Sequence, residues 1–300
     1  MFNFKSDIQF INYFRLFNFV SLILILISVG FIFYKGLNFG VDFKGGTLIE
    51  LRVENAEIGI GDVRQSFIKM NLGDVNVKKF GKGNDYLIKF EQTDKNKEDF
   101  IENIKTQLSK NLTGNFSFRR VENVGPKVSG ELLKSGLIAI VLSLSAMLIY
   151  IWIRFEWQFS LGAIIALIHD VIITIGFFSI LEFEINLSIV AALLTIVGYS
   201  MNDTVVIFDR VRENLKKYSS KSINEISNLS INETLSRTII TSLTTLLALL
   251  SIFFFGGKIL HGFSFAMILG VVFGTYSSIF IANPILIKLK VNQKSVLKGE

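Results

Sequence analysis

The stretch from Ser188 to Phe208, SIVAALLTIVGYSMNDTVVIF, is almost entirely apolar and yet carries Asn202 and Asp203. As a helix, a run of this length spans roughly 30 Å, the thickness of the hydrocarbon core of a bilayer. An ionisable side chain at that depth costs about 2.5 kcal/mol or more, so it is seldom present without a partner or an ion pathway. The stretch therefore predicts a membrane helix that carries a functional carboxylate.

The whole chain has the composition of a polytopic α-helical membrane protein. Half of its 300 residues are hydrophobic, 29 are Phe, and the mean hydropathy is +0.50. A helix needs about 20 apolar residues to cross a bilayer. Apolar runs of about this length predict six spans, at about 16–34, 135–153, 159–181, 186–208, 238–255 and 263–287. The first run is longer than the apolar part of a signal peptide and no cleavage pattern follows it, so we expect it to remain as an anchor.

The distribution of Lys and Arg predicts the orientation. Positive residues gather in the N-terminal tail, after the second span, between the fourth and fifth spans, and at the C-terminus: Lys5, Arg15, Arg154, Arg210, Arg212, Lys216, Lys217, Lys221, Arg237, Lys288, Lys290, Lys294 and Lys298. The turns on the opposite side offer only Lys258. By the positive-inside rule both termini are cytoplasmic. The net charge of +6 is thus explained by orientation, and no nucleic-acid partner is expected.

Residues 36–134 then form one soluble domain on the outer side. Short apolar strands at 47–53, 75–80, 86–90 and 116–124 alternate with amphipathic helices at 62–71 and 94–111. The order β-α-β-β-α-β is that of a ferredoxin-like α+β unit. The predicted organisation is a tail and first span (1–35), this domain (36–134), five further spans (135–287) and a cytoplasmic tail (288–300).

The segment between the fourth and fifth spans predicts a short amphipathic helix. Two stretches, 222–225 and 230–233, both read Ser-Ile-Asn-Glu and fit the capping-box pattern. Ile223, Ile226 and Leu229 share one face at helical spacing. We expect this helix to lie on the inner leaflet, with a docking surface for a partner as the alternative.

Arg237 is the candidate partner of Asp203. The fourth span descends to the cytoplasmic side and the fifth rises from it, so the two residues should lie at comparable depth and an ion pair is plausible. Tyr199 and Ser200 share the face of Asp203, and Thr238, Thr241, Ser242 and Thr245 form a polar stripe beyond Arg237. A guanidinium stays charged, whereas a carboxylate in an apolar medium can take up a proton, so protonation could break the pair. The alternative is a static pair or a carboxylate that reaches the headgroups.

His169 and Asp170 lie about midway along the third span. His169 is either a packing residue or a relay element, and Asp170 adds a second carboxylate. Two carboxylates also suggest an intramembrane aspartyl protease, but Asp203 does not stand in a GxGD motif and Arg237 would disfavour a shared proton. The chain has no cysteine, two well-separated histidines and no phosphate-binding loop, so we expect no metal site, no cofactor and no hydrolytic activity.

Five motifs resemble the SecF proteins of the SecD/SecF family, which is related to the RND transporters. They are VDFKGGT (41–47), VGPKV (124–128), ALIHD (166–170), VGYSMNDTVVIFDRVREN (197–214) and RTIITS (237–242), and the likeness covers nearly the whole chain. The resemblance implies a multi-pass subunit of the bacterial inner membrane that acts in Sec-dependent protein export, with its soluble domain in the periplasm. Asp203 and Arg237 match the family's proton-coupling carboxylate and arginine.

The resemblance also implies the partners. A separate SecD chain would supply the other half of an RND-type bundle, and the pair would act with the SecYEG translocon, accessory subunits such as YajC, unfolded exported polypeptides and membrane lipids. We therefore expect a subunit driven by the proton-motive force, with Asn202, Asp170 and His169 beside the main pair. The alternatives are half of a small-molecule or lipid transporter, which the short loop between spans three and four argues against, and a scaffold of the translocon. The residues leave open whether the ion is H⁺ or Na⁺.

Overall fold

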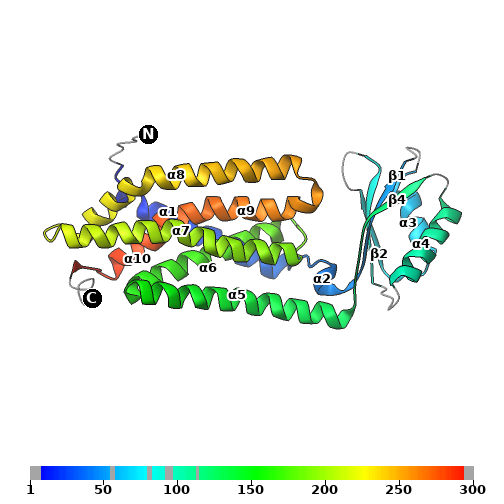
Figure 1. Cartoon of the computed structure of the whole chain (residues 1–300), viewed down its shortest axis with the longest axis horizontal. Coiled ribbons are helices and arrows are strands. Elements are labelled where there is room, and N and C mark those ends of the chain that lie inside the picture. The colour runs from blue at the N-terminus through cyan, green and yellow to red at the C-terminus, as the bar shows by residue number, and fades with distance from the viewer. Residues whose placement is uncertain (1–7, 55–57, 80–82, 92–96, 113–114, 294–300) are drawn as a thin grey trace. The chain divides into compact units, whose positions relative to one another are not determined.

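A computed structural model describes residues 8–54, 58–79, 83–91, 97–112 and 115–293 (Figure 1). These residues form two compact units, one made of Phe39–Leu137 and the other of the described parts of 1–38 and 138–300. Lys5, Lys294 and Lys298, which contributed to the predicted orientation, lie outside the described residues, as do residue 80 and residues 94–96 of the predicted strand and helix.

The membrane unit confirms the six predicted spans. Within the described residues six helices are long and apolar enough to cross a bilayer. They are α1 (Ile11–Lys35), α5 (Pro126–Arg154), α6 (Trp157–Ile180), α7 (Leu187–Lys217), α8 (Ile223–Phe255) and a run made of α9 (Lys258–Ser277), η1 (Ser278–Ala282) and α10 (Asn283–Lys288). α6, α7 and the α9 run form the interior, and α7 and α9 lie side by side (Figure 1).

Small residues set the closest helix contacts. A Cβ atom added at Gly176 of α6 would lie 2.2 Å from the Cβ of Ser28 on α1, whereas one added at Gly30 of α1 would meet nothing within 4 Å. In membranes such small residues let helices approach until their backbones touch.

Gly176→Ala is therefore expected to separate α1 from α6 and to lower the free energy of unfolding by about 1–3 kcal/mol, the usual cost of overpacking. The matched control Gly30→Ala also replaces a helical glycine but has open space, so it should be neutral or slightly stabilising. Thermal unfolding of the full chain in detergent compares them. Equal midpoints for the two variants would contradict the contact.

The segment between the fourth and fifth spans differs from the prediction of a separate helix on the leaflet. α8 is continuous from Ile223 to Phe255, so this segment is the first part of the fifth span's helix. Ile226 and Ile231 are 0% and 1% exposed, because the apolar face packs on the protein. The expectation of a separate amphipathic helix on the inner leaflet was wrong for that reason.

One of the two predicted capping boxes is present. Ser222 accepts from the backbone N–H of Glu225, whose carboxylate accepts from the N–H of Ser222. The second stretch lies inside the helix, where the Ser230 hydroxyl donates to the Ile226 carbonyl at 2.8 Å. A capping box needs free N–H groups, and a helix interior has none.

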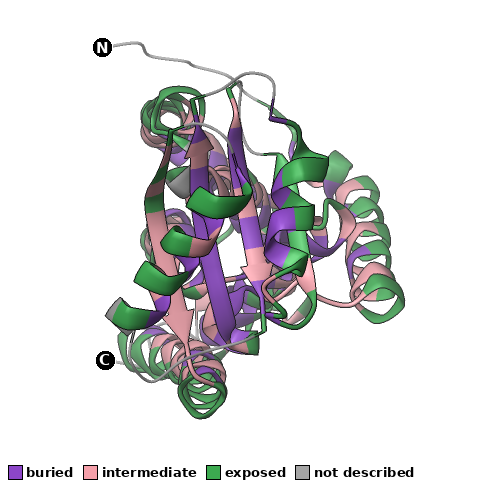
Figure 2. Ribbon diagram, turned by 90° about the vertical axis from the view of Figure 1, so that its right-hand side faces the viewer, coloured by how far each residue is buried: buried purple, intermediate pink, exposed green. Residues whose placement is uncertain are grey.

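The second unit has the predicted β-α-β-β-α-β order. After α2 (Val41–Lys44) come β1 (Gly46–Val53), α3 (Ile60–Ile68), β2 (Val75–Lys79), β3 (Asp85–Phe90), α4 (Lys97–Asn111) and β4 (Phe116–Val124). The four strands form an antiparallel sheet in the order β2-β3-β1-β4, and Figure 2 shows buried residues concentrated along its middle strands. Gly46 has φ 111°, and a Cβ there would lie 2.6 Å from the Phe90 carbonyl oxygen, so only glycine fits.

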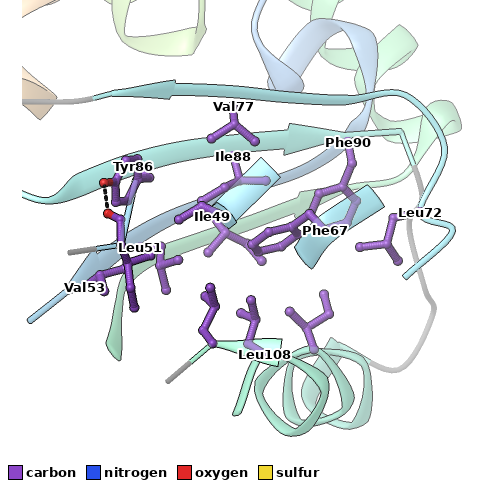
Figure 3. Packing of buried hydrophobic residues seen from close by; sticks show 14 of the residues in the cluster. Ile49, Leu51, Val53, Phe67, Leu72, Val77, Tyr86, Ile88, Phe90 and Leu108 are labelled. Carbon is purple, nitrogen blue, oxygen red and sulfur yellow. Dashed lines mark hydrogen bonds between the residues drawn. The ribbon is translucent and has the colours of Figure 1, made fainter. Parts of the chain in front are cut away.

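The core of this ferredoxin-like domain lies between the sheet and α3 and α4. Ile49, Ile88, Phe67 and Leu108 are fully buried in it (Figure 3). Tyr86 is 2% exposed, and its hydroxyl donates to the Ile58 carbonyl at 2.8 Å. The phenol is therefore held neutral in an apolar core.

Tyr86 makes the stability of the domain sensitive to alkaline pH. Burial, and to a lesser degree the charge of Asp62, raises the pKa of Tyr86. An unfolded phenol ionises at about pH 10, so the stabilisation is complete below that pH and is lost as the pH rises through the higher folded-state value. Tyr86→Phe should lower stability by about 1 kcal/mol at neutral pH and remove part of this alkaline loss. Urea unfolding of the full chain at several pH values, followed by circular dichroism, measures both effects; an identical alkaline loss in the variant would contradict the assignment.

Candidate functional site

Asp203 lies where three membrane helices meet. It is 4% exposed, and its Oδ2 accepts hydrogen bonds from Ser242 of α8 at 3.4 Å and from Thr275 of α9 at 3.3 Å. The two hydroxyls are 2.7 Å apart. Within the described chain no Lys, Arg or His lies within ion-pair distance of this carboxylate. Asp203 is thus a buried acid that is held by neutral hydroxyl groups alone.

The close packing of α7 on α9 positions this acid. Ser200, Asp203 and Thr204 follow at i, i+3 and i+4, so they share the face of α7 that meets α9. Gly274 of α9 allows the approach, because a Cβ there would lie 2.9 Å from the Cβ of Ser200. Thr275 is the next residue of α9 and therefore reaches Asp203.

Asp170 of α6 forms a second buried cluster, with residues of α7 and α9. It is 0% exposed, and its Oδ2 accepts from Ser200 of α7 at 2.7 Å and from Ser277 of α9 at 2.8 Å. Its Oδ1 lies 2.9 Å from Nδ1 of His169. Both clusters therefore join the same faces of α7 and α9, and a shift between these helices would disturb both carboxylates.

His169 has one nitrogen free in the described structure. Its ring is 2% exposed and stacks on Tyr276, with ring centroids 6.0 Å apart. Nδ1 faces Asp170, whereas the buried Nε2 has no hydrogen-bond partner among the described residues. A buried nitrogen without a partner destabilises the fold, and a ring with one free nitrogen can accept a proton.

Arg237 and Asp203 do not touch in this conformation. Arg237 is exposed, and it stands five positions before Ser242 in α8, the residue that does contact Asp203. Five helical residues rise about 7.5 Å, so Arg237 lies one and a half turns nearer the start of α8. The predicted ion pair between Asp203 and Arg237 is therefore not formed in this structure.

Asn202 is not part of either cluster. It is exposed on α7, about 100° around the helix from Asp203, and Thr195 and Gly198 are exposed on the same side as Asn202. Adjacent positions of a helix point about 100° apart, so Asp203 and Asn202 cannot both face the interior. In a membrane this exposed amide needs a polar partner.

Sequence reasoning missed the residues that the sixth span contributes. Thr275 and Ser277 hold the two carboxylates, and the run Thr275-Tyr276-Ser277-Ser278, four hydroxyl residues within one apolar span, was the available signal. The π-helix η1 follows immediately and ends before Pro284, which has no N–H to donate. The side-chain amide of Asn283 donates to the Ser278 carbonyl at 3.2 Å.

The two clusters lack the composition of a metal centre. In the part of the chain that the structure describes, no three His, Cys, Asp or Glu side chains gather closely enough to hold a metal ion. The arrangement instead suits proton binding by a carboxylate whose hydroxyl neighbours are neutral in both states.

Comparisons with known proteins agree on one family. Residues 104–292 match the model for "Protein export membrane protein SecD/SecF, C-terminal", and residues 30–57 match the "SecD/SecF GG Motif". The chain is 46% identical over 300 residues to a protein translocase subunit SecF of Rickettsia prowazekii, covering 99% of this chain and 96% of that protein. It is 48% identical over 283 residues to the SecF of Rickettsia bellii, covering 94% and 93%.

Solved structures show the same likeness. A crystal structure of SecDF from Thermus thermophilus, described as a translocon-associated membrane protein, superposes with a TM-score of 0.85 at 34% identity. SecDF in a "Super-membrane-facing form" superposes with a TM-score of 0.71 at 33% identity. In both cases the match covers 97% of this chain and 40% of the longer SecDF chain.

Proposed function

The chain belongs to the SecD/SecF family of protein export membrane proteins, and from that premise we propose that it is a SecF-type subunit that couples proton flow to protein export. Proton entry neutralises Asp203, changes its interaction with Arg237, and shifts the helices that carry the ferredoxin-like domain. The observation that carries the proposal is a buried carboxylate, 4% exposed, at the junction of three membrane helices.

The surroundings of Asp203 support a proton-dependent switch. Ser242 and Thr275 can accept or donate, so they hold either the charged or the protonated side chain. An ionised Asp203 attracts Arg237, which lies about 7.5 Å along α8 from Ser242, the α8 residue that contacts Asp203. A protonated Asp203 has no such attraction. The two protonation states thus favour different positions of α8 against α7.

The proton-motive force is large enough for this work. Each charge that crosses 100 mV releases about 2.3 kcal/mol, so two protons release about 4.6 kcal/mol. Moving a two-state equilibrium from mostly one form to mostly the other takes about 5.5 kcal/mol. Two protons per cycle therefore supply most of such a shift at 100 mV, and the proposal requires no hydrolytic activity of this chain.

A SecD-type chain is the proposed partner. The match to SecDF covers 40% of that longer protein, which leaves room there for a second bundle. The exposed face of α7 that includes Thr195, Gly198 and Asn202 suits a helix contact, because small residues allow close approach and the amide needs a partner. SecYEG, accessory subunits such as YajC, and exported polypeptides complete the proposed assembly.

The proposed location is the bacterial inner membrane, with the ferredoxin-like domain in the periplasm and both termini in the cytoplasm. Support comes from positive residues in the last part of α7 (Arg210, Lys216 and Lys217) and at the end of α10 (Lys288), which lie on the same side of the spans by topology.

Export into inverted inner-membrane vesicles tests the function. We expect vesicles with this chain and its SecD-type partner to export a precursor protein faster than depleted vesicles only while a proton gradient is present. A protonophore should remove the difference, and a sodium gradient in its place should not restore it. An equal contribution with and without any gradient would indicate a scaffold, and a change in solute accumulation with normal export would indicate a transporter.

A further inference from the structure

His169 and Asp170 of α6 form a buried pair of a base and an acid that the proposed cycle does not yet use. His169 is 2% exposed and Asp170 is 0% exposed. Nδ1 of the ring lies 2.9 Å from Oδ1 of the carboxylate, which is a hydrogen-bond distance. A proton therefore lies between these two atoms, because a bare ring nitrogen and a carboxylate oxygen would repel each other there.

With that single proton the pair has a net negative charge. The carboxylate is then ionised, the neutral ring donates from Nδ1, and Nε2 is a bare acceptor. Within the described residues no Lys or Arg forms an ion pair with Asp170, and the hydroxyls of Ser200 and Ser277 that donate to its Oδ2 are neutral. A buried charge without a counter-ion is costly. The pair loses this net charge when it takes up one further proton.

Nε2 of His169 is the position open to that proton. It is buried and has no hydrogen-bond partner among the described residues. The ring lies nearly parallel to that of Tyr276, with centroids 6.0 Å apart and planes 22° from each other. The face of an aromatic ring attracts a cation at about this distance. A protonated imidazole is therefore stabilised both by the carboxylate of Asp170 and by the ring of Tyr276.

Few other ionisable side chains face the pair from the helices that pack on α6. These helices are α1, α7 and the α9 run. The hydroxyl of Tyr276 already donates to the Phe17 carbonyl at 2.7 Å, and Asp203 of α7 faces α8 and α9. The other charged residues of these helices lie toward the helix ends: Arg15 and Lys35 in α1, residues 209–217 of α7, and Lys258 and Lys288 in the α9 run.

We propose that His169 and Asp170 form a second proton-binding site, at which Nε2 of His169 takes up a proton in the same cycle as Asp203. The inference rests on the proposed function and gives its cycle a second proton. One proton moves from the outer aqueous phase to Nε2 and is later released on the inner side. A shift of α7 against α9 changes the hydrogen bonds from Ser200 and Ser277 to Asp170, and with them the affinity of the pair for the proton.

Nitrogen-15 NMR of the histidine rings tests this site. The chain has two histidines, His169 and His261, so His261→Gln leaves one ring to observe. The full chain is labelled with nitrogen-15 histidine and placed in lipid nanodiscs. We expect Nδ1 of His169 to carry hydrogen throughout, and Nε2 to gain hydrogen in one step as the pH falls from about 9 to about 4. Hydrogen on Nε2 over this whole range, or at no pH within it, would overturn the proposal.

Asp170→Asn tests whether the carboxylate holds the proton. The amide keeps the shape of the side chain and can accept from Ser200 and Ser277, but it provides no negative charge. His169 should then bind the second proton at least about tenfold more weakly, which moves the NMR step by about one pH unit or more to lower pH. The control Asp209→Asn removes an almost half-exposed acid and should leave the step unchanged. Equal steps in the unmodified chain and Asp170→Asn would overturn the assignment.

The steepness of the response to membrane potential tests whether this proton belongs to the cycle. On a logarithmic scale, coupled export driven by two protons depends about twice as steeply on the potential as export driven by one. His169→Gln still offers an N–H to Asp170 but binds no proton, so the slope should fall to about half at equal amounts of inserted chain. A structural defect would lower export at every potential with the same slope, and that result would overturn the second proton.

Asp203→Asn separates this inference from the proposed function. The variant leaves His169 and Asp170 unchanged, so the NMR step of Nε2 should persist. Loss of the step would mean that the ring binds its proton only through Asp203, and would overturn a separate site. Normal gradient-dependent export in Asp203→Asn would refute the proposed function, whereas a missing step in the unmodified chain would overturn this inference and leave coupling at Asp203 intact.

Discussion

Asp203→Asn is expected to abolish the part of protein export that depends on the proton gradient. Asparagine has the same shape, and its amide oxygen can accept from Ser242 and Thr275 as the carboxylate does. It cannot bind or release a proton, so the switch stays in one state. Export with and without a protonophore in inverted vesicles measures the effect, and we expect the gradient-dependent increase to fall to the level of depleted vesicles.

Asp209→Asn is the matched control for this substitution. Asp209 lies six residues further along α7, where it pairs with Arg154 at 3.1 Å and both side chains are almost half exposed. Exposed pairs contribute about 1 kcal/mol at most, so this variant should export normally. Normal gradient-dependent export in Asp203→Asn would refute proton coupling at this residue. Loss of partner association in that variant would instead indicate a structural role.

The sequence predicted the bundle well because hydrophobicity alone determines where a helix can cross a membrane. It also predicted the order of the ferredoxin-like domain, since alternating apolar residues mark strands whichever neighbours they pair with. It did not predict where α8 begins. The stretch after Ser222 looked amphipathic, and only the structure shows that its apolar face, including Ile226, is buried against the protein.

The partners of the two carboxylates were harder to predict than the carboxylates themselves. Asp203 and Asp170 stand out because charge is rare in apolar segments. Thr275 and Ser277 do not, because hydroxyl residues are common in membrane helices and usually bond to their own helix. Their role follows from the close approach of α9 to α7 at Gly274, which no local pattern indicates.

Arg237→Gln should remove gradient-dependent export nearly as completely as Asp203→Asn. In the proposed cycle the ionised carboxylate draws α8 through the charge of Arg237, and glutamine provides no charge. Arg237→Lys keeps the charge but loses the planar fork, so we expect partial coupling. The measurement is again the difference in export with and without the protonophore, at equal amounts of membrane-inserted chain.

Moving the charge along α8 tests whether distance determines the coupling. Thr241 lies one helical turn beyond Arg237 and next to Ser242, which contacts Asp203. Arg237→Gln combined with Thr241→Arg brings the guanidinium about 6 Å closer along the helix axis, within reach of a permanent pair. A pair that never separates cannot cycle. We therefore expect this variant to stay uncoupled although its charge is restored, because the introduced guanidinium would stay paired with Asp203 in every state. If the double variant instead exported with full response to the gradient, the gap between Asp203 and Arg237 would have no role in the cycle.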